Sequence, residues 1–93
     1  MTIGLDFDDT FTLDPVCFSA LVSLTKCSGH KIYIVTCRLP EPESVADVMA
    51  VTKMPREHHV FTGMKPKREF CLARGLKIDV WMDDMPESIL FGR

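Results

Sequence analysis

Acidic side chains gather at two places in the chain. Asp6, Asp8 and Asp9 follow a short apolar run near the beginning, and Asp83 and Asp84 follow another such run near the end. Carboxylates that share one site repel each other unless a cation neutralises them. A ligand set made only of oxygen atoms favours Mg²⁺ over zinc or copper. If the fold brings the two groups together, we expect a magnesium site there.

Hydroxyl-bearing and basic residues also follow apolar runs. Thr10 lies beside the first acidic group, Thr36 ends a β-branched run with Arg38 two residues later, and Lys65 follows a third run. A metal, a lysine and hydroxyl groups can together neutralise the oxygens of a phosphoryl group while a carboxylate attacks the phosphorus. We therefore expect chemistry on a phosphate group, and Lys67 is an alternative to Lys65 because both flank the same proline.

Short apolar runs alternate with helix-like patterns along the chain, which predicts strands that alternate with helices. Four strands are expected, at residues 2–7, 31–36, 59–62 and 78–82. Caps, prolines and glycines mark the helix ends. The helices are expected from Pro15 to before Gly29, from a cap at Ser44 to about Lys53, from Pro66 or Lys67 to Arg74, and from Pro86 onwards.

This alternation predicts a single α/β domain over residues 1–93. The expected architecture is a Rossmann-like, doubly wound parallel sheet of about four strands with helices on both faces. Ligands of such sheets bind outside the carboxyl ends of the strands. Because each candidate residue follows a predicted strand, we expect all of them along one edge of the sheet.

Four segments resemble, in order, the four motifs of haloacid dehalogenase-like phosphatases. Ile3–Thr10 (IGLDFDDT) is similar to their strand followed by D-x-D-x-T, and Ile32–Arg38 (IYIVTCR) resembles their apolar strand that ends in Thr or Ser. Met64–Pro66 (MKP) is similar to the third motif, a lysine followed by proline. Val80–Asp84 (VWMDD) resembles the fourth, a strand that ends in paired aspartates.

The resemblance implies a role for each matched position. Asp6 would be the nucleophile that forms an aspartyl-phosphate, and Asp8 the general acid and base. Thr36 and Lys65 would hold and stabilise the phosphoryl group. Mg²⁺ would be bound by Asp6, by Asp8 through its backbone carbonyl, and by Asp83 and Asp84. Substrate contacts are expected from Asp9, Thr10, Thr36, Arg38 and Lys65.

Most members of that superfamily carry a cap domain at one of two insertion points, and here both points leave little room. A helix is predicted to begin just after Asp14, four residues beyond Thr10. Between Thr36 and Lys65 there is space for one helix and one strand. We therefore expect a capless enzyme whose open site suits a large phosphorylated substrate, such as a nucleotide, a nucleic-acid end or a phosphoprotein.

Two other functions use similar residues. A regulatory module could hold Mg²⁺ and a phosphorylated partner at the acidic edge without turnover. A response-regulator receiver also combines Asp, Thr, Lys and Mg²⁺, but its phosphorylated Asp follows the third strand. The third predicted strand here ends in Thr62 and Gly63, which argues against a receiver.

Composition limits the kinds of partner and the location that we expect for the protein. The chain is 46% hydrophobic and 26% charged, with a formal net charge of −2, which disfavours non-specific binding to duplex nucleic acid. No apolar stretch is long enough to cross a membrane and no leader is recognisable, so we expect a cytoplasmic protein. Four cysteines show no zinc-binding pattern and are expected to be reduced. An exposed edge strand would favour a homo-oligomer.

Overall fold

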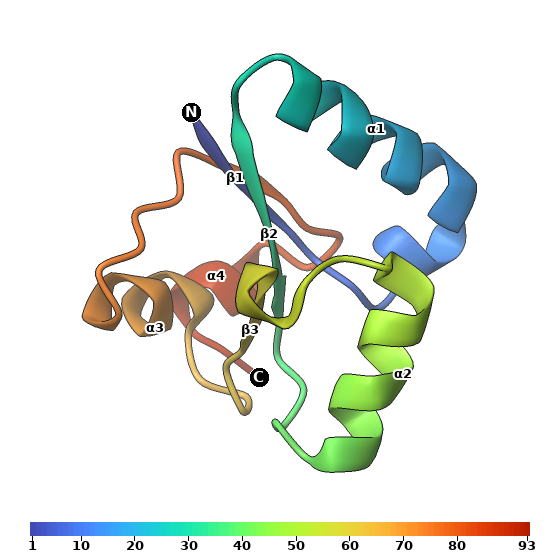
Figure 1. Ribbon diagram of the computed structural model, residues 1–93. Helices are drawn as coiled ribbons and strands as arrows, with labels where there is room; N and C mark the ends of the chain where they lie inside the picture. Colours follow the sequence, from blue (N-terminus) through green and yellow to red (C-terminus); the bar gives the residue numbers. More distant parts are fainter.

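The computed structural model describes residues 1–93 and contains one four-stranded sheet (Figure 1). The strands are β1 (Thr2–Leu5), β2 (Lys31–Thr36), β3 (His59–Phe61) and β4 (Val80–Met82). All neighbouring strands are parallel, in the order β3-β2-β1-β4. This confirms the predicted Rossmann-like sheet. The chain winds outward from β1 to β3 and then returns to place β4 on the other side of β1, which creates a switch point between β1 and β4.

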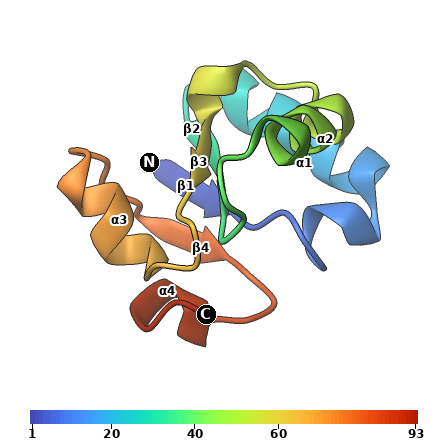
Figure 2. The same ribbon diagram turned by 90° about the horizontal axis from the view of Figure 1, so that it is seen from below.

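Helices cover both faces of the sheet (Figure 2). The four α-helices are α1 (Pro15–Cys27), α2 (Pro42–Thr52), α3 (Lys67–Ala73) and α4 (Glu87–Leu90). Two short 3-10 turns, η1 (Phe11–Leu13) and η2 (Arg56–His58), complete the structure. Figures 1 and 2 show α1 and α2 on one face and α3 on the other, where α4 packs against it.

The helix starts follow local chemistry. The Asp14 carboxylate accepts a hydrogen bond of 3.1 Å from the Cys17 N–H, and Pro15 is the first residue of α1, as predicted. The prediction for α2 is wrong at its start, since the helix begins at Pro42 and Ser44 lies inside its first turn. Proline is well suited to a first helical position because its fixed φ is already helical.

Alternation along the strands divides the core between the two faces. The side facing α1 and α2 holds the larger apolar cluster, which consists of Ile3, Leu5, Phe7, Phe11, Val22, Ile32, Ile34, Val48, Met54 and Phe61. The α3 face holds a smaller cluster of Val35, Val60 and Cys71. Gly4 faces the second cluster, and a Cβ atom there would lie 2.9 Å from the Trp81 ring.

No cap domain interrupts the sheet. Only η1 lies between Thr10 and α1, and only α2, η2 and β3 lie between Thr36 and α3. This confirms the capless architecture. None of the helices combines the length and apolar composition that crossing a bilayer requires. Strands β3 and β4 are the edges of the sheet, and self-association through an edge stays a prediction.

Candidate active site

Three aspartates converge at the switch point. Asp6 directly follows β1, and its N–H donates a 2.9 Å hydrogen bond to the carbonyl of Met82, the last residue of β4. Asp83 and Asp84 follow Met82. One carboxylate oxygen from each of the three aspartates lies within 4.8 Å of the other two. The adjacent, parallel strands therefore bring together the two acidic groups that the sequence places far apart, and we call Asp6, Asp83 and Asp84 the acidic triad.

A buried lysine neutralises part of the triad. The Nζ of Lys67 lies 2.7 Å from Oδ1 of Asp6 and 2.5 Å from Oδ2 of Asp83. Lys67 is only 1% exposed. It is the first residue of α3, and side chains in the first helical turn lean toward the helix N-terminus, which here points at the carboxyl edge of the sheet. This geometry gives Lys67 the contact with Asp6.

The structure does not bring Lys65 to the triad. Lys65 is exposed, and its Nζ lies 6.0 Å from the centre of the Phe70 ring. Pro66 separates the two lysines and is the N-cap of α3, so the chain turns between them. The position that the sequence analysis assigned to Lys65 is therefore occupied by its alternative, Lys67.

Burial makes Asp6 unusual. Loss of hydration raises the pKa of Asp6 to about 6, and the hydrogen bond from Lys67 opposes this effect only in part. A carboxylate in this position is anionic at neutral pH, and additional positive charge nearby would stabilise its anionic form. A divalent cation at the triad would supply it.

Thr10 connects the first acidic segment with the last. Its Oγ1 lies 3.2 Å from Oδ2 of Asp6 and 3.1 Å from Oδ1 of Asp84, and it accepts a 3.2 Å hydrogen bond from the Asp84 N–H. A hydrogen bond shared with Asp6 holds the pKa of Asp84 below its usual range, with a smaller contribution from Thr10. Thr10 therefore fixes the relative positions of two members of the triad.

Asp83 is held by groups that the sequence analysis missed. The Met85 N–H donates to Oδ1 of Asp83 at 2.9 Å, and the buried Ser88 hydroxyl donates to Oδ2 at 3.3 Å. Both oxygens of Asp83 are therefore engaged within the protein. Asp84 is the more exposed of the two, so it has the freer oxygens for a ligand.

Asp8 lies outside the triad and is paired with Arg38. The Arg38 Nε donates to Oδ2 of Asp8 at 2.8 Å, and the second guanidinium bond reaches Oδ1 at 2.8 Å. The pair is bidentate, and Arg38 holds the pKa of Asp8 below its usual range. The guanidinium also lies over the Phe7 ring and reaches the Ser44 hydroxyl at 3.4 Å. Arg38 was predicted to contact substrate, and here it positions Asp8.

Thr36 and Asp9 complete the predicted set. Thr36 is buried at the end of β2, and its hydroxyl oxygen accepts a 3.3 Å hydrogen bond from the Arg38 N–H. Asp9 is exposed, with a left-handed φ of 61°, and its N–H donates to the Thr12 hydroxyl at 3.0 Å. No bond joins either residue to the triad. Their expected substrate contacts stay predictions.

The donor set fits a hard divalent cation. The triad offers only oxygen, it lies beside a positively charged lysine, and one of its members is partly open to solvent. Magnesium commonly binds through one or two carboxylates, with water and phosphate oxygens filling the remaining positions. The carboxylates are therefore suitable ligands, and the identity of the ion stays a prediction.

Fold and site together define a class: a Rossmann-like α/β domain with an acidic triad and a buried lysine at the carboxyl edge of its sheet. A scan of protein-family models, a search of curated proteins and a search of solved structures found no match to the chain.

Proposed function

We propose that this protein is a capless, magnesium-dependent phosphohydrolase of the haloacid dehalogenase-like type. One observation carries the proposal: Asp6, at the end of inner strand β1, lies 2.7 Å from the buried Lys67 and within reach of Asp83 and Asp84. A nucleophilic carboxylate, a lysine donor and a metal-binding carboxylate pair are the groups that transfer of a phosphoryl group requires.

In the proposed reaction, an Asp6 oxygen attacks the phosphorus of a phosphate monoester. The bond from phosphorus to the leaving-group oxygen breaks, and that oxygen takes a proton from Asp8. Water then attacks the phosphorus of the aspartyl-phosphate and gives a proton to Asp8. The bond between phosphorus and Asp6 breaks, which releases phosphate and restores both carboxyl groups.

Arg38 constrains this sequence of steps. It occupies both oxygens of Asp8, so one of the two hydrogen bonds has to open before Asp8 can exchange a proton with the leaving group. An incoming phosphate carries negative charge that competes for the guanidinium. We propose that substrate binding draws Arg38 from Asp8 toward the phosphoryl group, and that Asp8 then takes up from solvent the proton that it gives to the leaving group.

The triad would hold Mg²⁺ together with the Asp8 backbone carbonyl. When bound, the ion neutralises charge on the transferring phosphoryl group. Lys67 supplies a second positive charge from the protein side, and Thr36 supplies a hydroxyl at the end of the neighbouring strand. Because no cap covers this edge, the leaving group can be large, and nucleotides and nucleic-acid ends are the first substrate class to test.

The test is hydrolysis of a generic aryl phosphate with Mg²⁺ and with a chelator. Asp6→Asn is compared with Asp47→Asn, a matched change at an exposed position on α2. The proposal predicts Mg²⁺-dependent turnover that Asp6→Asn abolishes and Asp47→Asn retains. Turnover that survives in Asp6→Asn would contradict a nucleophilic role for Asp6.

A second candidate is a non-catalytic module that binds Mg²⁺ and a phosphorylated partner. This function is favoured by the ion pairs within the site, because they engage the groups that catalysis would use. Lys67 bridges Asp6 and Asp83, and Arg38 holds Asp8. Titration calorimetry with Mg²⁺ and phosphate separates the two functions. Binding in a folded protein that turns over no phosphate ester would favour the module.

A further inference from the structure

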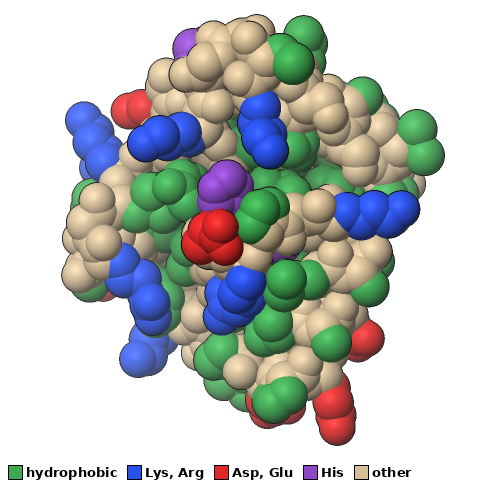
Figure 3. Space-filling view, in the orientation of Figure 1, with side chains coloured by type: hydrophobic (Ala, Val, Ile, Leu, Met, Phe, Trp, Pro, Cys, Tyr) green, Lys and Arg blue, Asp and Glu red, His purple; other side chains and the backbone are tan.

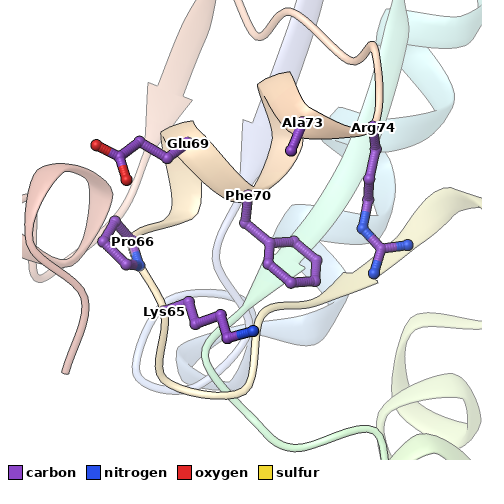
Figure 4. A pocket seen from close by; sticks show the side chains of 6 residues that line it. All are labelled: Lys65, Pro66, Glu69, Phe70, Ala73 and Arg74. Atoms are coloured by element: carbon purple, nitrogen blue, oxygen red, sulfur yellow. The ribbon is translucent and has the colours of Figure 1, made fainter.

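A pocket on the outer side of α3 has no part in the proposed chemistry. Its volume is about 460 Å³, and its lining residues, labelled in Figure 4, are Lys65, Pro66, Glu69, Phe70, Ala73 and Arg74. Pro66 directly precedes Lys67, whose ammonium contacts Asp6. The pocket therefore begins in the loop that leads into the candidate active site. Its volume lies within the usual range of ligand pockets.

Two cations face one aromatic ring in this pocket. The Arg74 guanidinium lies 4.2 Å from the centre of the Phe70 ring, and the Lys65 ammonium lies 6.0 Å from it. Neither cation makes a salt bridge, and Glu69 is the single acidic residue in the lining. Phe70 also packs on the small core cluster, which holds the ring in place. The pocket thus carries an anchored aromatic ring and two unpaired positive charges.

A second hollow continues from the first. It has a volume of about 440 Å³ and shares Arg74 with the pocket on α3. Arg56 lines it, and the Arg56 guanidinium lies 5.0 Å from the centre of the Phe61 ring. The Phe61 ring itself is buried in the larger core cluster. The aromatic ring that lines this hollow is Tyr33, and Glu57 is its acidic residue. Figure 3 shows this face, where Lys and Arg side chains lie beside hydrophobic ones and an acidic side chain lies near the centre.

We infer that the two hollows form a groove for single-stranded nucleic acid, with its terminal phosphate at Asp6. This inference rests on the proposed function and names its substrate class. Arginine planes and aromatic rings stack on nucleobases, and unpaired cations contact the backbone phosphates. In a duplex the bases are stacked on one another, so their faces are not accessible to the arginine and aromatic side chains of the groove. An acidic peptide would use the charges alone.

Lys65 and Arg74 have separate roles in this groove. Lys65 lies at the end next to the active site and contacts the phosphate after the terminal nucleotide. Arg74 lies between the hollows and stacks a base against the Phe70 side of the groove. Glu69 in the first hollow and Glu57 in the second oppose the polyanion, so their charges weaken binding.

The test measures binding of a fluorescent single-stranded oligonucleotide without a terminal phosphate, in the presence of a chelator. Under these conditions the groove is tested without turnover. The Lys65→Ala/Arg74→Ala double variant is expected to bind about tenfold more weakly or worse, with a smaller dependence on salt. Arg68→Ala is the matched control, since Arg68 is exposed on α3 but does not line the groove. Glu69→Gln is expected to bind more tightly.

An oligonucleotide of abasic sites tests the stacking on the unchanged protein. We expect it to bind about tenfold more weakly than the normal strand. Equal binding of the two strands, or an equal loss in Arg68→Ala and in the double variant, overturns the inference. Hydrolysis of aryl phosphate without oligonucleotide binding leaves the proposed function standing and removes the groove. Oligonucleotide binding without hydrolysis of aryl phosphate leaves the groove standing and removes the proposed function.

Discussion

Lys67 Nζ lies 2.7 Å from Oδ1 of Asp6, although the two residues are 61 positions apart in the sequence. Both side chains are buried, and Lys67 is the one buried lysine of the chain. A buried charge pair is costly to break from one side, because the remaining charge loses both its partner and its hydration. This pair therefore links the stability of the fold to the charge of the proposed nucleophile.

Replacement of Lys67 tests its role in the proposed reaction. Lys67→Met is expected to lower kcat for an aryl phosphate by about 100-fold to 1,000-fold, the usual effect of losing one donor to a charged transition state. Without metal, it should also lower the unfolding free energy by about 3 kcal/mol, because Asp6 and Asp83 lose their shared cation. Lys65→Met is the comparator, with a decrease in kcat below about tenfold. A larger loss in Lys65→Met than in Lys67→Met would contradict the assignment.

The raised pKa of Asp6 predicts how stability depends on pH. A carboxyl group whose pKa is 3.8 when unfolded and about 6 when folded binds protons more tightly in the fold. Its contribution to stability is present below pH 3.8 and is lost as the pH rises through 6, a change of up to about 3 kcal/mol. Between pH 4 and pH 8, the unfolding free energy of the metal-free protein should therefore fall by more than that of Asp6→Asn, which lacks this group. Denaturant unfolding in a chelator measures this, and an equal difference between the two proteins at both pH values would contradict it.

The ion pair between Arg38 and Asp8 predicts the opposite dependence of stability on pH. Arg38 lowers the pKa of Asp8, so the pair stabilises the fold above the unfolded pKa of Asp8 and loses this effect as the pH falls through the folded value. Both side chains are about one-third exposed, which limits the coupling to about 0.5–1 kcal/mol. A double-mutant cycle with Arg38→Gln and Asp8→Asn at pH 7 and at low pH measures it. A coupling that persists at low pH would rule out an ionic pair.

Thr10 is expected to control metal affinity through Asp84. Thr10→Val keeps the shape of the side chain but removes the hydroxyl that contacts Asp6 and Asp84. Loss of such a supporting group commonly weakens metal binding by about 10-fold to 100-fold. Calorimetric titration with Mg²⁺ should show this loss, and Thr10→Ser should restore most of the affinity. Unchanged Mg²⁺ affinity in Thr10→Val would contradict a role for the hydroxyl.

The sequence predicts the positions of the acidic groups because the rule that locates them is local. Asp6 and Asp83 each follow a short apolar run, and parallel strands bring their carboxyl ends to one edge. The pairing of β1 with β4 then determines which aspartates meet. These features depend on hydrophobic periodicity and on the right-handed crossover, both of which leave a signal in the sequence.

The choice between Lys65 and Lys67 could not be made in the same way. It depends on the residue at which α3 begins and on the direction of the first side chain, and helix ends are the least certain part of any sequence-based assignment. The contact of Arg38 with Asp8 could not be predicted from the sequence either, because it joins two loops and leaves no periodic pattern. Its second neighbour, Ser44, was expected as a cap because the start of α2 was placed too late.

The most direct test of the proposed function is a search for the aspartyl-phosphate itself. The protein is mixed with an aryl phosphate and Mg²⁺, quenched in acid during turnover, and digested for mass spectrometry. We predict a phosphoryl group on the peptide that contains Asp6, absent in Asp6→Asn and in the presence of a chelator. Magnesium-dependent release of phosphate that continues in Asp6→Asn, with no phosphorylated peptide in either protein, would contradict the account.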